Sequence, residues 1–148
     1  MAFKLSQRSL DNLEGVDDAL QAVCKMAISS TLVDFGVICG MRTEAMQKEL
    51  FAKGASQCDG VKKKSKHQLG LAVDCMAYLS GRASWELKVY DEIADAMADA
   101  CNQVGVRCRW GAAWHIHDIG AWAKSGRKDV VKPNKLPSKV IIVRPYRS

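Results

Sequence analysis

His67 and Asp74 lie seven residues apart, within the segment 65–74 and on either side of Gly70, where a turn is predicted. Asp74 stands in an apolar run that indicates a strand, so a loop imidazole and a strand carboxylate could converge on one metal ion. Both groups are ordinary zinc ligands, and a catalytic zinc site needs three protein ligands and one open position. A histidine and an aspartate at this spacing are also common as a surface pair or in a satisfied turn.

The chain has three histidines, and the other two, His115 and His117, form a second candidate group. In an extended segment these two side chains point to the same face, so either could reach a metal already held by His67 and Asp74. Each is equally well explained as a surface residue or as one that stacks beside Trp114. The residues alone leave the third ligand open.

Basic residues occur close to these candidate ligands. Arg42 falls between a predicted strand and a predicted helix, where it is either solvated or points into a cleft and binds a carboxylate or a carbonyl. A run of lysines just before His67 is by default a solvated loop, but its position would let it steer an anionic substrate. The run consists of Lys62, Lys63, Lys64 and Lys66.

The candidate ligands and Arg42 must be held in place by the surrounding helices and strands. Apolar residues at intervals of three and four predict helices near residues 16–30, 43–53 and 85–104, after a short one near residues 9–13. We expect Thr43 and Ser84 to act as N-caps. The apolar residues expected to face inward from the second long helix are Met46, Leu50 and Phe51.

Strands are predicted where β-branched and aromatic residues alternate. They fall at residues 33–39, around Asp74 and at residues 106–110, and a last strand at residues 139–144 is expected at a sheet edge. We therefore predict an α+β domain with a small, mostly antiparallel sheet. The sheet would carry the metal residues on one face, and the helices would flank it.

Length and composition are those of one globular domain over residues 1–148, with an irregular stretch at 124–139. The six cysteines form no C-x-x-C pair, which favours reduced core thiols. A formal charge of +6 admits polyanionic partners such as nucleic acid, an anionic cell wall or acidic lipid. No apolar run approaches the roughly 20 residues of a membrane span, and no secretory signal is visible, so a cytoplasmic protein without a transmembrane segment is expected.

Short segments spread over roughly residues 1–120 carry a family resemblance. The most specific is the motif Ser-x-His-x-x-Gly-x-Ala-Val-Asp at residues 65–74, accompanied by Asp-Phe-Gly-Val at 34–37, Gly-Met-Arg-Thr at 40–43, Gln-Lys-Glu-Leu at 47–50 and Arg-Trp-Gly at 109–111. In these segments the chain resembles the phage-type L-alanyl-D-glutamate endopeptidases. These enzymes belong with the VanY- and VanX-like D-Ala-D-Ala peptidases and share a zinc fold with the Hedgehog signalling domain.

The resemblance implies a zinc-dependent endolysin. It would be made in the host cytoplasm and, after release, would hydrolyse the L-Ala–D-Glu bond of the peptidoglycan stem peptide with a metal-activated water. His67 and Asp74 would be two zinc ligands, and Arg42 would bind and polarise the substrate. In the family mechanism an acidic residue takes the proton of the water, while metal and arginine hold the oxyanion.

Expected partners follow from the same resemblance. They are the stem peptide and the anionic wall or lipopolysaccharide surface, which positive charge would help the protein to reach. We expect a monomer. A nucleic-acid partner is not expected, because the chain has no helix-turn-helix signature and no RNA-binding aromatic motif.

The chain departs from the family pattern near its C-terminus. The family has an Asp-x-x-His or Glu-x-x-His that gives the general base and the third zinc ligand, but no histidine follows His117 here, and Ala113 replaces a common aspartate. Three explanations stay open. His115 or His117 supplies the third ligand with Asp118 as the base; the domain is a wall-binding homologue that binds zinc poorly and cleaves nothing; or the end of the gene is altered, for instance by a frameshift.

Overall fold

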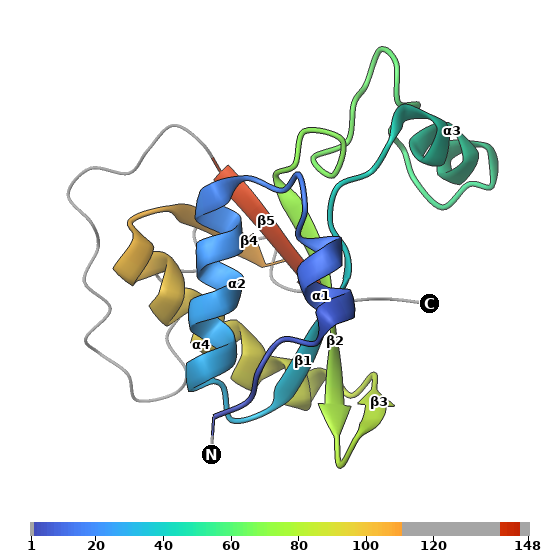
Figure 1. Cartoon of the computed structure of the whole chain (residues 1–148). Coiled ribbons are helices and arrows are strands. Elements are labelled where there is room, and N and C mark those ends of the chain that lie inside the picture. The colour runs from blue at the N-terminus through green and yellow to red at the C-terminus, as the bar shows by residue number, and fades with distance from the viewer. Residues whose placement is uncertain (1, 111–139, 146–148) are drawn as a thin grey trace.

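The computed structural model describes residues 2–110 and 140–145 and has an α+β architecture, as predicted (Figure 1). Four helices and five strands lie along these residues. In chain order they are α1 (Gln7–Asn12), α2 (Asp18–Ser30), β1 (Asp34–Cys39), α3 (Glu44–Ala52), β2 (Ala72–Leu79), β3 (Arg82–Ser84), α4 (Leu87–Val104), β4 (Arg107–Trp110) and β5 (Val140–Pro145).

Strand β2 is the centre of the sheet. β1 and β3 pair with it in antiparallel orientation, which confirms the expected antiparallel unit. β5 pairs with β2 in parallel orientation, and β4 pairs in parallel with β5, which gives the order β1-β2-β5-β4. The expectation that the last strand lies at a sheet edge is wrong, because β5 lies between β2 and β4.

The core lies between one face of the sheet and helices α2 and α4. Both helices carry the predicted apolar stripes, and their buried side chains pack against alternate residues of β1 and β2. Successive residues of a strand point to opposite faces, so the face of β2 that carries Val73, Cys75 and Ala77 meets the helices. Asp74 therefore points to the other face of the sheet.

Helix α4 begins later than predicted. Its N-cap is Glu86, without a side-chain cap bond, and the prediction of Ser84 as the cap is wrong. Ser84 belongs to β3, where it pairs with Ala77, and its carbonyl accepts a hydrogen bond from the Tyr90 hydroxyl at 2.8 Å. The helix ends at Gly105, whose φ of 83° suits glycine.

Helix α3 stands apart from the sheet in Figure 1. Thr43 caps it as predicted, since its side chain accepts the N–H of Met46. The expected inward face is wrong for two residues: Met46 and Phe51 are 47% and 48% exposed. The buried residue of α3 is Gln47, because this helix packs on the loop that follows it rather than on the apolar core.

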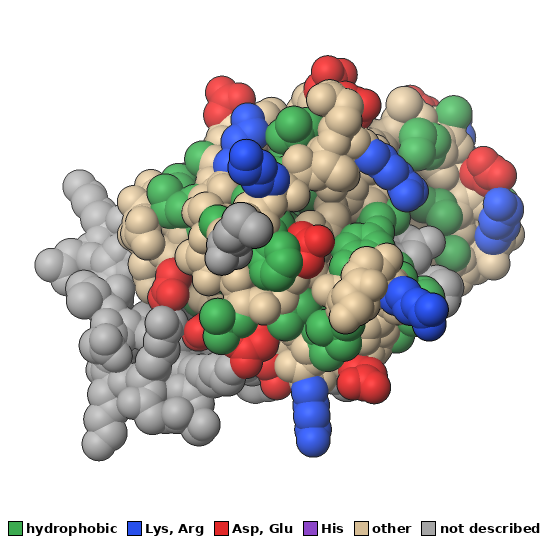
Figure 2. Space-filling model, turned by 60° about the horizontal axis from the view of Figure 1, so that its bottom comes forward, with side chains coloured by type: hydrophobic (Ala, Val, Ile, Leu, Met, Phe, Trp, Pro, Cys, Tyr) green, Lys and Arg blue, Asp and Glu red, His purple; other side chains and the backbone are tan. Residues whose placement is uncertain are grey.

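The surface and the thiols agree with an ordinary globular domain. On the face shown in Figure 2, acidic and basic side chains are interspersed with apolar ones. Cys24, Cys75 and Cys101 are free and buried in the core, which agrees with the reduced core thiols that the sequence favoured. None of the described helices combines the length and apolar character that a membrane span needs.

Candidate metal centre

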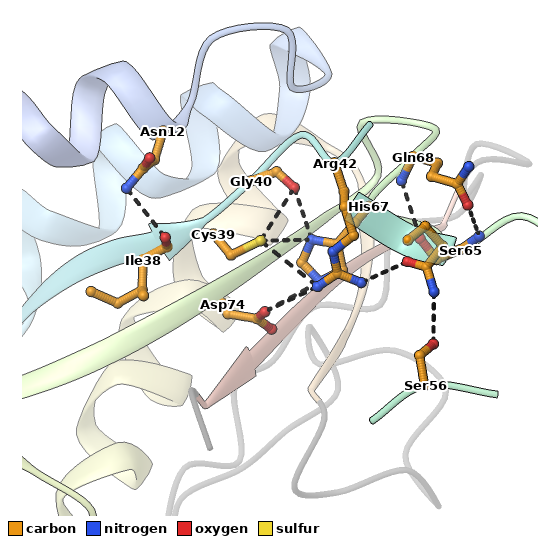
Figure 3. Close-up of polar contacts among 11 residues, drawn as sticks. Asn12, Ile38, Cys39, Gly40, Arg42, Ser56, Ser65, His67, Gln68 and Asp74 are labelled. Carbon is orange, nitrogen blue, oxygen red and sulfur yellow. Dashed lines mark hydrogen bonds and ion pairs between the residues drawn. The ribbon is translucent and has the colours of Figure 1, made fainter. Parts of the chain in front are cut away.

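Residues from four parts of the chain meet beside the first residues of β2 (Figure 3). They are the end of β1, the segment that joins β1 to α3, the loop before β2, and β2 itself. The loop reaches this position because Gly70 turns with a φ of 70° and packs closely on the chain at Gly15, where a side chain would meet the Gly15 carbonyl at 2.8 Å.

His67 is the most buried member of the site, with 1% of its surface exposed. Its Nδ1 lies 2.8 Å from the carbonyl oxygen of Gly40. A carbonyl only accepts hydrogen bonds, so Nδ1 donates and Nε2 is the nitrogen that faces the Asp74 carboxylate, 3.4 Å from Oδ2. The backbone carbonyl therefore fixes both the ring orientation and the tautomer, as the hydrogen-bond partner of the other ring nitrogen does for metal-bound histidines.

The spacing between these two groups suits a metal ion. Two N or O ligands about 2.0–2.1 Å from a tetrahedral zinc lie about 3.4 Å apart. Burial alone would lower the pKa of His67, but its contacts with Asp74, Cys39 and Gly40 favour the imidazolium, and the pKa lies above its ordinary value. The surroundings of His67 thus stabilise positive charge on the ring. A proton and a metal ion would compete for its Nε2 atom.

Arg42 lies beside the His67–Asp74 pair. Its Nη2 is 3.9 Å from Asp74 Oδ2, and its backbone N–H donates to the His67 carbonyl at 3.1 Å. The guanidinium is only 10% exposed, which rejects the solvated alternative that the sequence left open. It is held in place through Nη1, which donates to Gln47 Oε1 at 2.8 Å.

Gln47 begins one of the segments that carry the family resemblance, but the sequence assigned it no role in the site. It is completely buried, and its Nε2 donates to Ser56 Oγ and to the Cys58 carbonyl, each at 2.8 Å. The side chain thus ties α3, the following loop and the arginine together. The polar residue at the centre of a weakly apolar helix was the signal that could have revealed it.

Replacing Gln47 by leucine is expected to lower the free energy of unfolding by about 1–3 kcal/mol, because the Cys58 carbonyl and the Arg42 guanidinium lose buried partners. Urea denaturation followed by circular dichroism measures this change. Gln7→Leu is the matched control, since Gln7 is exposed and bonds to Asp11 on the surface of α1. An unchanged midpoint for Gln47→Leu would contradict the role given to this residue.

Cys39 is also part of the candidate metal centre, although the sequence favoured a core position for the cysteines. It is half-buried at the end of β1, and its Sγ lies 3.8 Å from His67 Nδ1 and 3.7 Å from Arg42 Nη2. Burial opposes ionisation of the thiol, but the hydrogen bond and charge of His67 together with Arg42 outweigh it, and the pKa of Cys39 lies below its ordinary value. One ligand atom each from Cys39, His67 and Asp74 lie within 4.8 Å of one another.

The structure thus brings Arg42, His67 and Asp74 together from separate segments. The other predicted site residues, His115, His117 and Asp118, lie outside the described residues, as do Ala113 and the stretch 124–139.

Comparison with known proteins places the chain in a family. The family model for the phage L-alanyl-D-glutamate peptidases matches residues 1–131. The chain belongs to this family. It is 32% identical over 116 residues to the L-alanyl-D-glutamate peptidase of Escherichia phage T5, an alignment that covers 78% of this chain and 84% of the phage protein.

A solved structure of the same kind of enzyme agrees with the fold. The crystal structure of the Serratia marcescens L-Ala D-Glu endopeptidase ChiX superposes with a TM-score of 0.69 at 36% sequence identity. The match covers 79% of this chain and 86% of that chain. The resemblance stated from the short sequence segments is thereby confirmed for family and fold.

Proposed function

We propose that this protein is a zinc-dependent endopeptidase that hydrolyses the L-Ala–D-Glu bond of the peptidoglycan stem peptide. The observation that carries the proposal is the pairing of His67 Nε2 with Asp74 Oδ2 beside Arg42, whose side chain is largely shielded from solvent, in a chain of this family. The bond proposed for cleavage is the L-Ala–D-Glu bond, because the relatives from Escherichia phage T5 and Serratia marcescens are an L-alanyl-D-glutamate peptidase and an L-Ala D-Glu endopeptidase. Zinc is the proposed metal because one imidazole and one carboxylate at this spacing suit it.

His67 and Asp74 would hold the ion from the sheet side, and the sequence offers His115 or His117 as a further ligand. A zinc ion held by these residues would supply a bound water of lowered pKa and a Lewis acid for the carbonyl. Gly40 keeps His67 in the tautomer that presents Nε2, so no rearrangement of the ring is needed when the site fills.

Arg42 would bind the oxygen of the scissile carbonyl as negative charge develops on it. The Gln47 bond fixes one side of the guanidinium and leaves the rest of the fork beside Asp74 and Cys39. A donor that is already oriented costs no reorganisation in the transition state, which is the usual source of oxyanion stabilisation. We keep Asp118 as the proposed base that accepts the proton of the water.

The lysine loop would guide the substrate. The side chains of Lys62, Lys63, Lys64 and Lys66 are exposed. The Asp59 carboxylate shapes the loop, because its Oδ1 accepts the backbone N–H groups of residues 61, 62 and 63 at 2.9–3.0 Å. The D-Glu residue of the stem peptide is anionic, so a positive loop just before His67 would raise the local substrate concentration. We further propose release from the host cytoplasm before action on the wall.

Digestion of purified peptidoglycan tests the proposal. Mass spectrometry of the products should show peptides with a new N-terminal D-Glu, and removal of metal by a chelator should abolish cleavage until zinc is added back. Products cut at another bond, or cleavage that persists after chelation, would contradict the proposal. Binding to the wall without any cleavage by the zinc-loaded protein would support the inactive homologue, which the missing C-terminal histidine favours.

A further inference from the structure

An irregularity in β1 aims Cys39 at the metal centre. Val37 pairs with Cys75, but the next pair along the two strands joins Cys39 to Asp74, so β1 has one residue more than β2 between these pairs. Such a β-bulge re-aims the side chains that follow it and is common beside active sites. In a regular ladder Ile38 would be opposite Asp74; the bulge puts a thiol in that position instead.

Contacts from α1 hold the bulge. Asn12 Nδ2 donates to the Val37 carbonyl at 2.7 Å and to the Ile38 carbonyl at 3.3 Å, the latter visible in Figure 3. Gly40 then packs so tightly against α1 that a side chain there would clash with the backbone carbonyl of Asn12. The position of Cys39 is therefore set by side-chain and backbone contacts on both sides of it.

Directly opposite residues of an antiparallel pair share one face, with Cβ atoms about 4.5–5.5 Å apart. Cys39 and Asp74 meet this condition, and His67 lies over the same face. Arg42 Nη2 faces both the sulfur and the carboxylate, at 3.7 Å and 3.9 Å, so one cation already neutralises part of their charge. Thiolate, imidazole and carboxylate are the three ligand types that zinc accepts.

We propose that Cys39 is a metal ligand, so that its thiolate completes a three-residue set with His67 and Asp74. On binding, a sulfur–metal bond forms and the thiol proton is released to solvent. The inference rests on the proposed function, because it concerns the same metal. It would give a third ligand to a chain that has no histidine after His117 but brings Arg42, His67 and Asp74 together.

Cobalt substitution tests this proposal by spectroscopy. Metal-free protein is titrated with Co²⁺ under reducing, oxygen-free conditions, and the near-ultraviolet absorption of the thiolate-to-cobalt charge transfer is recorded. We expect the band in the unmodified protein and in Cys58→Ser, but not in Cys39→Ser. Cys58 is the matched control, because it is also half-buried and free but is not in the cluster.

Zinc affinity and thiol protection give two further measurements. Cys39→Ser should bind zinc at least about tenfold more weakly, the minimum for loss of even a supporting group. In the unmodified protein, bound zinc should protect Cys39 from alkylation, as mapped by mass spectrometry, while Cys58 reacts at the same rate with and without metal. The second measurement needs no substitution and so does not depend on the folding of a variant.

The outcomes separate this proposal from the one on which it rests. Cobalt that binds through His67, as shown by its loss in His67→Ala, but gives no thiolate band would overturn the role of Cys39 and leave the proposed function standing. A band that persists in Cys39→Ser would do the same. Failure of the unmodified protein to bind either metal would overturn both proposals.

Discussion

Asp74→Asn is expected to remove stoichiometric zinc from the purified protein and to reduce peptidoglycan cleavage by at least about a hundredfold. Asparagine keeps the shape of the side chain but lacks the negative charge that faces both His67 Nε2 and Arg42 Nη2. A neutral amide oxygen is a much weaker zinc ligand than a carboxylate, so the site should lose its metal without losing its packing. Metal analysis by mass spectrometry and the clearing rate of a wall suspension measure the two effects.

Asp74→Asn separates a loss of metal binding from a loss of stability better than a substitution of His67 does. Removing the buried imidazole would also leave a cavity and deprive the Gly40 carbonyl of its donor. Asp91→Asn is the matched control, because Asp91 is an exposed residue of α4. Full zinc occupancy in Asp74→Asn, with unchanged far-ultraviolet circular dichroism, would show that the carboxylate is not a ligand.

Arg42→Ala should leave the zinc content unchanged and lower kcat by about 10²–10³, the usual cost of losing one oxyanion donor. The reason is that Arg42 contacts the ligand residues but is itself a cation, so it serves the substrate rather than the metal. Arg42→Lys should recover little of the loss. A single ammonium cannot donate to Gln47 and also face Asp74, whereas the planar fork does both.

Steady-state kinetics on a soluble stem-peptide substrate, together with metal analysis, checks this expectation. Arg82→Ala is the matched control, because Arg82 is exposed in β3. A variant that loses zinc along with activity would assign Arg42 to the integrity of the metal centre. A variant with full kcat would remove it from the reaction.

Sequence periodicity predicted the elements that build the core and failed where packing is polar. The stripes of α2 and α4 were readable because each helix buries one apolar face against the sheet. In α3 the same reasoning selected Met46, but the helix buries Gln47 through hydrogen bonds to its own loop. The position of β5 between β2 and β4 depends on pairing between distant segments, which local pattern does not contain.

The sequence likewise identified some residues of the candidate site and missed others. The motif at residues 65–74 was enough to single out His67 and Asp74, and the structure brings the two side chains to 3.4 Å. Cys39 was missed because its direction depends on a one-residue bulge, and a period of two carries no sign of where a register shift occurs. Arg42 was recognised as a candidate, but the buried glutamine that orients it was not.

The candidate metal donors and the proposed substrate-binding residue, Arg42, are anchored to different parts of the protein. Asp74, Cys39 and the Gly40 carbonyl that orients His67 belong to the sheet or continue directly from it, whereas the Arg42 guanidinium is tethered to α3 and the loop behind it. Figure 1 shows α3 standing away from the sheet. A change in α3 or its loop could therefore shift the Arg42 guanidinium while leaving Asp74, Cys39 and the Gly40 carbonyl where they are.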